Sequence, residues 1–357
     1  MRFLYDFYRL YAIACIMRAG GNVYDVSLLE RELLRTDWDP TETAFGMPYP
    51  PWTLPFFYVF GFLPFYTALA VCFGLSIVLL LLIVALSYKV SCLGNLSSRA
   101  CTVKQRLVYL ALFFPLFKVL LYGQPTFIAL LGLTLFSYLI FHRKPFSAGL
   151  ALSLCSLKPQ LLVPFFVVVL IWELKQHRLL VINGLLMGVI LQILIALIIV
   201  PDSFSQYLEF LPSFMTSSAQ LSYPTLTQLF KQLTGIAASP YILLIPGLLT
   251  AMWIAFRFDF SFRLLYLLVL PLSVLVAPYS WSHDFAFLLL PYILICEHFF
   301  QRISPLRIAL LLLPLFATSI YLMGPPQEMY MIWLPLAIFV LSLFVLNNQT
   351  RERSNAL

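Results

Sequence analysis

Long apolar stretches separated by short polar loops make up most of the chain beyond residue 60. A helix that crosses a bilayer needs about 17–25 mostly apolar residues, and shorter apolar helices are buried inside bundles. Apolar stretches of this kind lie at 65–88, 107–122, 125–141, 146–157, 160–173, 179–200, 236–256, 262–277, 285–300, 305–323 and 328–346. The pattern predicts an all-α polytopic membrane protein with about eleven transmembrane helices. Lys158-Pro159 separates the two short stretches 146–157 and 160–173, which could be half-helices that meet within the membrane.

The composition agrees with a membrane protein. Hydrophobic residues make up 62% of the 357 residues and charged residues 10%, with a mean hydropathy of +0.93, whereas soluble domains carry about 25% charged residues. We expect one integral-membrane domain over 1–357 and no separate soluble catalytic domain. Its predicted parts are interfacial helices and a loop on the outer face (1–50), the transmembrane bundle (65–346) and a cytoplasmic tail (347–357).

Two segments outside the predicted spans have interfacial character. In the first fifty residues, amphipathic helices are expected at Tyr5–Met17 and Val26–Leu34, separated by Gly20-Gly21-Asn22. Neither helix is apolar enough to cross the membrane, so both are expected to lie at its surface. The segment 202–233 mixes aromatic residues with Ser, Thr and Gln and is expected to behave in the same way.

The charges in the loops predict the orientation. Most of the 22 Lys and Arg residues fall in one alternating set of short loops, and Arg351 and Arg353 follow the last span. Cytoplasmic loops carry such an excess of basic residues, so the C-terminus is predicted to be cytoplasmic. The net charge of +7 is scattered over these loops rather than gathered on one face, and therefore does not indicate nucleic-acid binding.

Polar motifs interrupt the apolar pattern on the opposite, outer face. This shared sidedness predicts a functional site there. The motifs are Asp6-Phe7-Tyr8, Tyr49-Pro50-Pro51, Gly123-Gln124, Leu157-Lys158-Pro159-Gln160 and Ser280-Trp281-Ser282-His283-Asp284.

Two kinds of charged residue in and near these motifs have alternative interpretations. Asp6 and Arg9 share a helical face. They could form an interfacial ion pair, or Asp6 could act as a general base. Lys158 could extend toward the membrane surface, or it could bind a phosphate together with the backbone donors that Pro159 leaves free. Lys118, one helical turn before Gly123-Gln124, could point into the same pocket or toward the lipid.

Two motifs are candidates for catalysis and for metal binding. Asp284 could orient the ring of His283, but adjacent residues diverge on a helix, so each is expected to face the pocket separately. Asp37-Trp38-Asp39 has the DxD pattern that holds a divalent cation in many sugar-nucleotide transferases. No set of three His, Cys or Glu ligands accompanies it, so Asp37 and Asp39 are only a weak metal candidate. Motifs for nucleotide binding or serine hydrolysis are missing from the sequence.

Taken in order, the polar motifs, together with Gly20-Gly21-Asn22-Val23-Tyr24, resemble those of the family-87 glycosyltransferases, polytopic enzymes of the GT-C class. The resemblance covers roughly residues 5–300. It implies a polyprenyl-phosphate sugar, typically mannose, as donor on the outer face of a bacterial cytoplasmic membrane. By the same resemblance, Asp6 is the expected base, His283 lies near the reacting groups and Lys158 contacts the donor phosphate. The remaining expected substrate contacts are Gln124, Gln160, Tyr49, Arg9, Asp284 and Lys118.

The resemblance also bears on the beginning of the chain. Family members usually have a membrane helix before the Asp-Phe motif, whereas Asp6 is almost at the first residue here. Either the start codon lies further upstream, which would bring the spans to twelve, or this protein has lost its first span and is impaired. We expect the first.

The residues suit inverting transfer by a single displacement to a lipid-linked or cell-envelope glycan. A sugar phosphate contains its own leaving group, so neither a general acid nor a metal or other cofactor is expected. Asp6 or His283 could accept the acceptor's proton, and Lys158 could stabilise the departing phosphate. A polytopic transporter or lipid flippase is the main alternative, because broken helices and an intramembrane Lys also suit a substrate pathway. A polymerase or ligase of lipid-linked glycans would use the same face and differ in its acceptor.

Overall fold

The structure of the protein is a computed structural model, and it describes residues 5–36, 38, 46, 48–93, 102–218, 223–236, 239–300, 303–322 and 327–354. Within these residues every regular element is a helix, and none is a strand. The predicted all-α fold class is therefore confirmed. Asp37 and Asp39, the weak metal candidate, lie outside the described residues.

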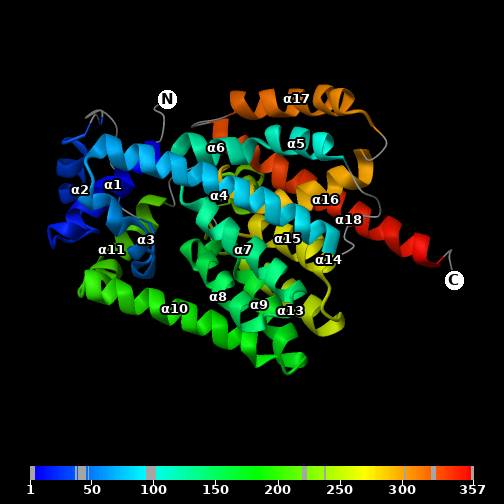
Figure 1. The fold of residues 1–357 in the computed structure, drawn as a ribbon, viewed down its shortest axis with the longest axis horizontal. Helices are drawn as coiled ribbons and strands as arrows, with labels where there is room; N and C mark the ends of the chain where they lie inside the picture. The colour runs from blue at the N-terminus through cyan, green and yellow to red at the C-terminus, as the bar shows by residue number, and fades with distance from the viewer. Residues whose placement is uncertain are drawn as a thin grey trace.

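Short helices α1, α2, α3 and α11 gather at one end of the molecule, and the C-terminus lies toward the opposite end (Figure 1). The sequence predicts α1 and α2 to within one residue, and the Asp25 side chain caps α2 by accepting hydrogen bonds from two backbone N–H groups. The elements outside the bundle are α1 (Tyr5–Arg18), α2 (Val26–Leu33), η1 (Pro51–Thr53), α3 (Pro55–Tyr58), η2 (Val59–Phe62), α11 (Ser203–Ser218) and α12 (Leu226–Thr234).

The remaining elements form the bundle, and each predicted span corresponds to a helix or to a pair of broken helices. In chain order they are α4 (Phe65–Leu93), α5 (Val103–Ala111), α6 (Phe114–Tyr122), α7 (Thr126–Phe141), α8 (Pro145–Ser153), η3 (Leu154–Leu157), η4 (Pro159–Leu161), α9 (Val163–Lys175), α10 (Leu179–Ile199), α13 (Leu244–Arg257), α14 (Phe262–Leu264), η5 (Leu265–Val269), α15 (Leu270–Leu275), η6 (Asp284–Leu288), α16 (Leu289–Phe300), α17 (Pro305–Tyr321), η7 (Gln327–Ile332) and α18 (Trp333–Ser354).

Three stretches of helix in the described part of the chain are long and apolar enough to cross a membrane, at Phe65–Leu93, Leu179–Ile199 and Gln327–Asn348. A fourth is added if α5 and α6, which meet at an angle of 56°, form one bent span. The other apolar helices are shorter, at 10–17 residues. The structure is thus that of a polytopic membrane protein, while the count of eleven spans stays a prediction.

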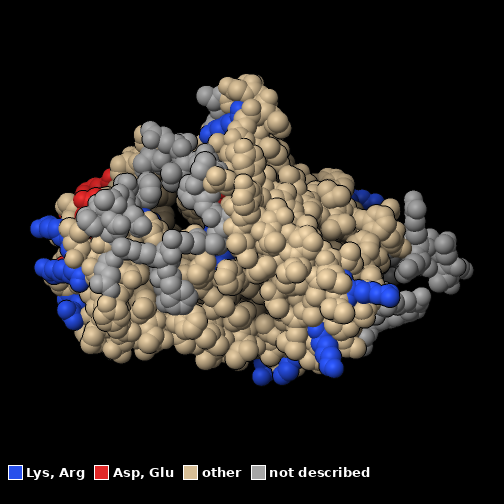
Figure 2. Space-filling view, turned by 90° about the horizontal axis from the view of Figure 1, so that it is seen from above, with Lys and Arg blue, Asp and Glu red and all other residues tan. Residues whose placement is uncertain are grey.

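The surface has the apolar character that a bilayer requires. Leu186, Ile190 and Leu194 of α10 expose 54%, 49% and 51% of their surface, an apolar stripe that would be costly in water. Among the described residues on the face in Figure 2, most carry no charge, and Lys and Arg lie at its margins. Lipid is the solvent that suits this surface.

Close backbone packing holds the half-helix α8 against the long helix α10. A Cβ atom at Gly149 of α8 would lie 2.0 Å from the carbonyl oxygen of Val181, and one at Gly184 of α10 would lie 2.1 Å from that of Phe146. Small residues of this kind allow membrane helices to approach closely. This contact fixes the half-helix that leads to Lys158, at the break between η3 and η4.

Candidate active site

The polar motifs that the sequence analysis singled out on the outer face lie together in the structure. Their side chains come from the start of α1, the segment before η1, the turn between α6 and α7, the break between η3 and η4, and the loop before η6. Most of the side-chain atoms that contact one another here are buried, and they come from segments far apart in the chain.

A chain of hydrogen bonds joins five of the predicted site residues. The Nε2 atom of Gln124 donates to Oδ2 of Asp6 over 2.5 Å. The Oε1 atom of Gln124 accepts from the Tyr49 hydroxyl over 2.9 Å and from Nζ of Lys158 over 3.2 Å. Lys158 also forms an ion pair with Oδ1 of Asp284. The Gln124 amide therefore connects the Asp6 carboxylate to the buried Lys158–Asp284 pair.

Two local features of the backbone place Gln124 and Lys158 at this point. Gly123 ends α6 in the left-handed conformation, with φ of 66°, which favours glycine and turns the chain sharply before Gln124. Pro159 cannot continue a helix through Lys158, whose φ of −136° and ψ of 62° are not helical. Both site residues therefore lie where a membrane helix stops.

A second buried ion pair lies beside the first. Nζ of Lys118 donates to Oε1 of Glu328 over 2.5 Å and to the Ser282 hydroxyl over 2.6 Å. The same Glu328 oxygen accepts hydrogen bonds from the backbone N–H and the hydroxyl of Ser282, over 2.9 and 2.7 Å. Lys118 therefore points into the site, and Glu328 holds both it and the loop that carries His283.

The sequence analysis did not include Glu328 among the site residues. It lies in η7, 46 residues after Ser282 and 210 residues after Lys118, so no local spacing connects it to the motifs. The one available signal was an acidic residue in an outer loop directly before an apolar span.

His283 is buried between the two ion pairs. Its Nε2 atom lies 3.5 Å from Oδ1 of Asp284, so the expectation that these neighbours face the pocket separately is wrong. His283 has helical dihedral angles, with φ of −70° and ψ of −24°, and Asp284 begins the 3₁₀ helix η6. The two side chains leave the backbone in different directions and approach each other at their tips. Burial, followed by the charges of Lys158 and Lys118, holds the pKa of His283 well below 6.5, which makes the ring neutral at pH 7. Its Nδ1 atom is buried and has no hydrogen-bond partner among the described residues.

Asp6 has the properties of a base at the edge of the cluster. It is half-buried and its Oδ1 atom makes no hydrogen bond to the described residues. Burial raises the pKa of its carboxyl above the usual 3.8, although the nearby Arg9 charge, the Gln124 hydrogen bond and the Lys158 charge oppose this effect. The carboxylate therefore binds a proton more strongly than a carboxylate exposed to water.

Two of the residues expected to contact substrate, Arg9 and Gln160, have other surroundings. Arg9 stacks over the rings of Tyr5 and Trp38, at 5.1 and 5.5 Å from the ring centroids, and donates to the Tyr5 hydroxyl. Gln160 is half-buried in η4 and makes no hydrogen bond to the described residues. The described residues also contain no group of three or more His, Cys, Asp or Glu side chains that could hold a metal ion.

The arrangement leaves both buried ammonium groups with capacity for an anion. Each carries three N–H donors. Lys158 uses two of them, on Gln124 and Asp284, and Lys118 uses two, on Ser282 and Glu328. Lys158 is buried and does not extend to the membrane surface, and Asp284 offsets its charge. Two directed donors, a neutral His283 and a strengthened carboxylate can together bind an anionic group and deprotonate a hydroxyl.

An apolar cavity of about 430 Å³ lies between α5, α6, α16, α17 and α18. Its walls include Phe113 and Phe114 at the bend between α5 and α6, Tyr292 of α16 and Trp333 of α18. Trp333 directly follows η7, which carries Glu328, and Phe114 lies one turn before Lys118. The cavity is thus continuous in structure with the elements that hold the ion pair.

Comparison with known proteins gives one match. The model of a family described as Glycosyltransferase family 87 matches residues 48–291. Neither a curated protein nor a solved structure matches the chain. The matched range includes Tyr49, Gln124, Lys158 and the His283-Asp284 pair. Asp6 and Glu328 lie outside this range, and their contacts in the folded chain place them in the site.

Proposed function

The chain belongs to glycosyltransferase family 87 and is a membrane glycosyltransferase, and we propose that it transfers mannose from a polyprenyl-phosphate donor to a lipid-linked or cell-envelope glycan. The observation that carries this proposal is the network that joins Asp6, through Gln124, to the buried Lys158–Asp284 pair. In this network, the carboxylate proposed as proton acceptor and the ammonium group proposed to bind phosphate contact the two ends of one amide.

The proposed reaction is an inverting single displacement. The acceptor hydroxyl oxygen attacks the anomeric carbon of the donor sugar as the bond from that carbon to the phosphate oxygen breaks. Asp6 accepts the hydroxyl proton, and the bonding electron pair leaves with the polyprenyl phosphate. The remaining N–H donors of Lys158 and Lys118 stabilise the charge on the departing phosphate. The product has the opposite anomeric configuration to the donor.

Neutral His283 has a proposed binding role. An unpartnered polar atom in a buried site costs about 1–3 kcal/mol, and Nδ1 of His283 is such an atom in the described structure. A sugar hydroxyl that bonds to this nitrogen would satisfy it. The ring would then orient the donor or acceptor sugar beside the phosphate.

The apolar cavity is the proposed place for the beginning of the polyprenyl chain. Its lining of aromatic and aliphatic side chains offers an isoprenoid the environment of the membrane interior, and the Lys118–Glu328 pair lies on the elements at its edge. We also propose that the site faces the extracytoplasmic side of a bacterial cytoplasmic membrane, with the C-terminus in the cytoplasm. The charge pattern of the loops supports this orientation.

The reaction should need no divalent metal, because the leaving polyprenyl phosphate is a phosphate monoester whose charge two ammonium groups can contact. Transfer would then continue in the presence of a chelator.

The test uses the purified chain in lipid nanodiscs. Polyprenyl-phosphate sugars that carry radiolabelled mannose, glucose or galactose are supplied with a bacterial membrane-lipid extract, with and without EDTA. The proposal predicts label from the mannosyl donor in new glycolipid, inverted at the anomeric carbon and insensitive to EDTA. Label from another donor would overturn the choice of mannose. Retained configuration would overturn the single displacement. Translocation of the donor across vesicles without transfer would favour a transporter or flippase.

A further inference from the structure

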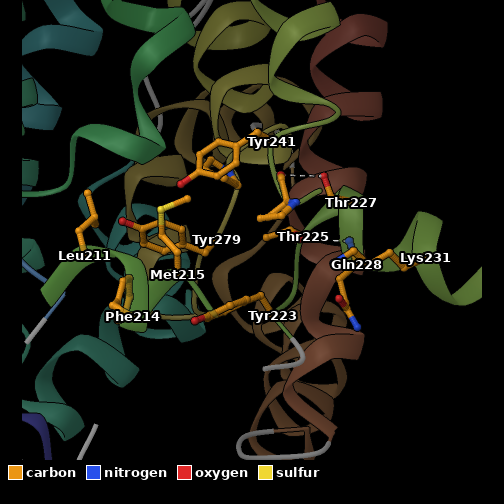
Figure 3. A pocket seen from close by; sticks show the side chains of 12 residues that line it. Leu211, Phe214, Met215, Tyr223, Thr225, Thr227, Gln228, Lys231, Tyr241 and Tyr279 are labelled. Atoms are coloured by element: carbon orange, nitrogen blue, oxygen red, sulfur yellow. Dashed lines mark hydrogen bonds between the residues drawn. The ribbon is translucent and has the colours of Figure 1, made fainter. Parts of the chain in front are cut away.

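A pocket rich in tyrosine lies on the other side of the loop that carries His283 and Asp284. Figure 3 shows Tyr223, Tyr241 and Tyr279, which come from three different segments and line one space. Gln228 and Lys231 of α12 add an amide and an ammonium group to the lining. We call these five residues the tyrosine pocket, and neither the polar motifs nor the proposed mechanism assigns it a role.

The tyrosine pocket is directly connected to the site. Tyr279 lies in the same loop as His283 and Asp284, five residues before Asp284. The next aromatic residue of this loop, Trp281, packs edge-on against Tyr223 with 5.0 Å between ring centroids. Its backbone N–H donates to Oδ2 of Asp284 over 2.9 Å. One short turn therefore forms the wall of the pocket and also holds the carboxylate that pairs with Lys158.

The chemistry of the lining matches a sugar ring. The faces of tyrosine rings pack against the C–H groups of a hexose, while phenol, amide and ammonium groups can exchange hydrogen bonds with its hydroxyls. The pocket encloses only about 50 Å³, which suits one edge of a single ring rather than a buried cofactor. Among the described residues, no carboxylate lines the pocket, which disfavours a cation, and Lys231 is the only charged residue in its lining, which disfavours a polyphosphate.

We propose that the tyrosine pocket binds the terminal hexose of the acceptor glycan. A sugar held against Tyr241 and Tyr279 would extend around Trp281 toward Lys158 and Asp284, where transfer takes place. The assignment as the acceptor subsite rests on the proposed function, whereas binding of a hexose in the pocket does not depend on it. Tyr241 is the ring best suited to a test, because it is exposed at the rim and not part of the loop that holds the ion pairs.

The test measures sugar binding without transfer. The complete chain in nanodiscs is titrated with the methyl glycosides of mannose, glucose and galactose, followed by saturation-transfer NMR on the ring protons of each sugar. The variants are Tyr241→Ala and Lys231→Gln. The matched control is Tyr321→Ala, because Tyr321 ends α17, is 81% exposed and does not line the pocket. Asp6→Asn separates sugar binding from catalysis.

We expect at least one methyl glycoside to bind, and Tyr241→Ala to weaken it about tenfold through the lost ring contact. Binding should be unchanged in Tyr321→Ala and in Asp6→Asn. Unchanged binding in Tyr241→Ala, or no binding of any of the sugars, would overturn the proposal even if the enzyme transfers sugar. Dependence on Lys231 but not on Tyr241 would overturn it in favour of an anion site. Binding that depends on Tyr241 in a chain that transfers no sugar would leave the hexose pocket standing and remove only its role as acceptor subsite.

Discussion

Glu328 is predicted to stabilise the site by neutralising a buried cation. Lys118 is 1% exposed and Glu328 3% exposed, and their closest atoms are 2.5 Å apart. Replacing Glu328 by Ala would leave the Lys118 ammonium buried without a counter-charge and Ser282 without its acceptor. Removing one partner of a buried pair costs about 3–5 kcal/mol. Glu328→Gln keeps an acceptor oxygen and loses only the charge, so its expected cost is about 1–2 kcal/mol.

A double-mutant cycle isolates the pair itself. If the ammonium and the carboxylate interact directly, Lys118→Met and Glu328→Gln together should cost about 2 kcal/mol less than the sum of the two single changes. Glu32→Gln is the matched control, because Glu32 pairs with Arg35 over 2.6 Å, but the Arg35 side chain is 75% exposed. Such a surface pair contributes no more than about 1 kcal/mol.

Thermal unfolding of the purified chain in detergent, followed by tryptophan fluorescence, gives the comparison. With roughly 2 °C for each kcal/mol, Glu328→Ala should lower Tm by about 6–10 °C and Glu328→Gln by about 2–4 °C, with little change in Glu32→Gln. Strictly additive effects of the Lys118 and Glu328 changes would refute the buried pair. A Tm of Glu328→Ala equal to that of the control would refute it as well.

Three further predictions concern donor binding, proton transfer and a second ion pair. Lys158→Gln should lower kcat/KM for the donor about 100-fold or more, since it removes a cation at the phosphate; steady-state kinetics with unchanged constants would contradict this role. The pH profile of kcat/KM should fall as pH decreases through the pKa of Asp6, because only the ionised base accepts a proton, and this fall should lie above pH 3.8 since burial raises that pKa. Because Asp6 is the proposed base, the same acid limb should persist in His283→Asn, and its disappearance would assign the base to His283 instead. Glu297 forms a buried ion pair with Arg106 over 2.7 Å, outside the candidate active site. Glu297→Gln should lower Tm by about 2–6 °C, while kcat/KM per folded enzyme stays within about twofold. A loss of activity without a loss of stability would contradict this purely structural role.

Helix positions and breaks were predictable because they depend on local sequence. The apolar stretches correspond to helices, and Lys158-Pro159 breaks the chain where a proline excludes helical geometry for its neighbour. Pro115 lies at the start of α6 and accounts for the 56° bend between α5 and α6. The number of spans depends on where the bilayer lies across many short helices, which composition alone does not determine.

The members of the site were predictable, but their pairing was not. Polar residues are costly in a membrane protein, so Asp6, Lys158 and His283 stood out wherever they fell along the chain. Which carboxylate neutralises which ammonium depends on tertiary packing, and the partner of Lys118 is Glu328, 210 residues away in the sequence. The contact between His283 and Asp284 was missed because the directions in which neighbouring side chains leave a helix do not determine where the ends of those side chains lie.

Asp6 is the proposed base of the glycosyltransferase site, at the end of a buried hydrogen-bond chain. Substitution of its carboxylate is the most direct test of this role. Asp6→Asn and Asp25→Asn are compared with the parent chain in nanodiscs, with radiolabelled polyprenyl-phosphate mannose and a membrane-lipid extract. Asp25 is the matched control, because it is a half-buried helix cap outside the site and Asn can replace it as a cap. We expect the rate of mannose transfer to fall about 100-fold or more in Asp6→Asn, with donor binding retained, and to be unchanged in Asp25→Asn. Full transfer in Asp6→Asn would contradict it.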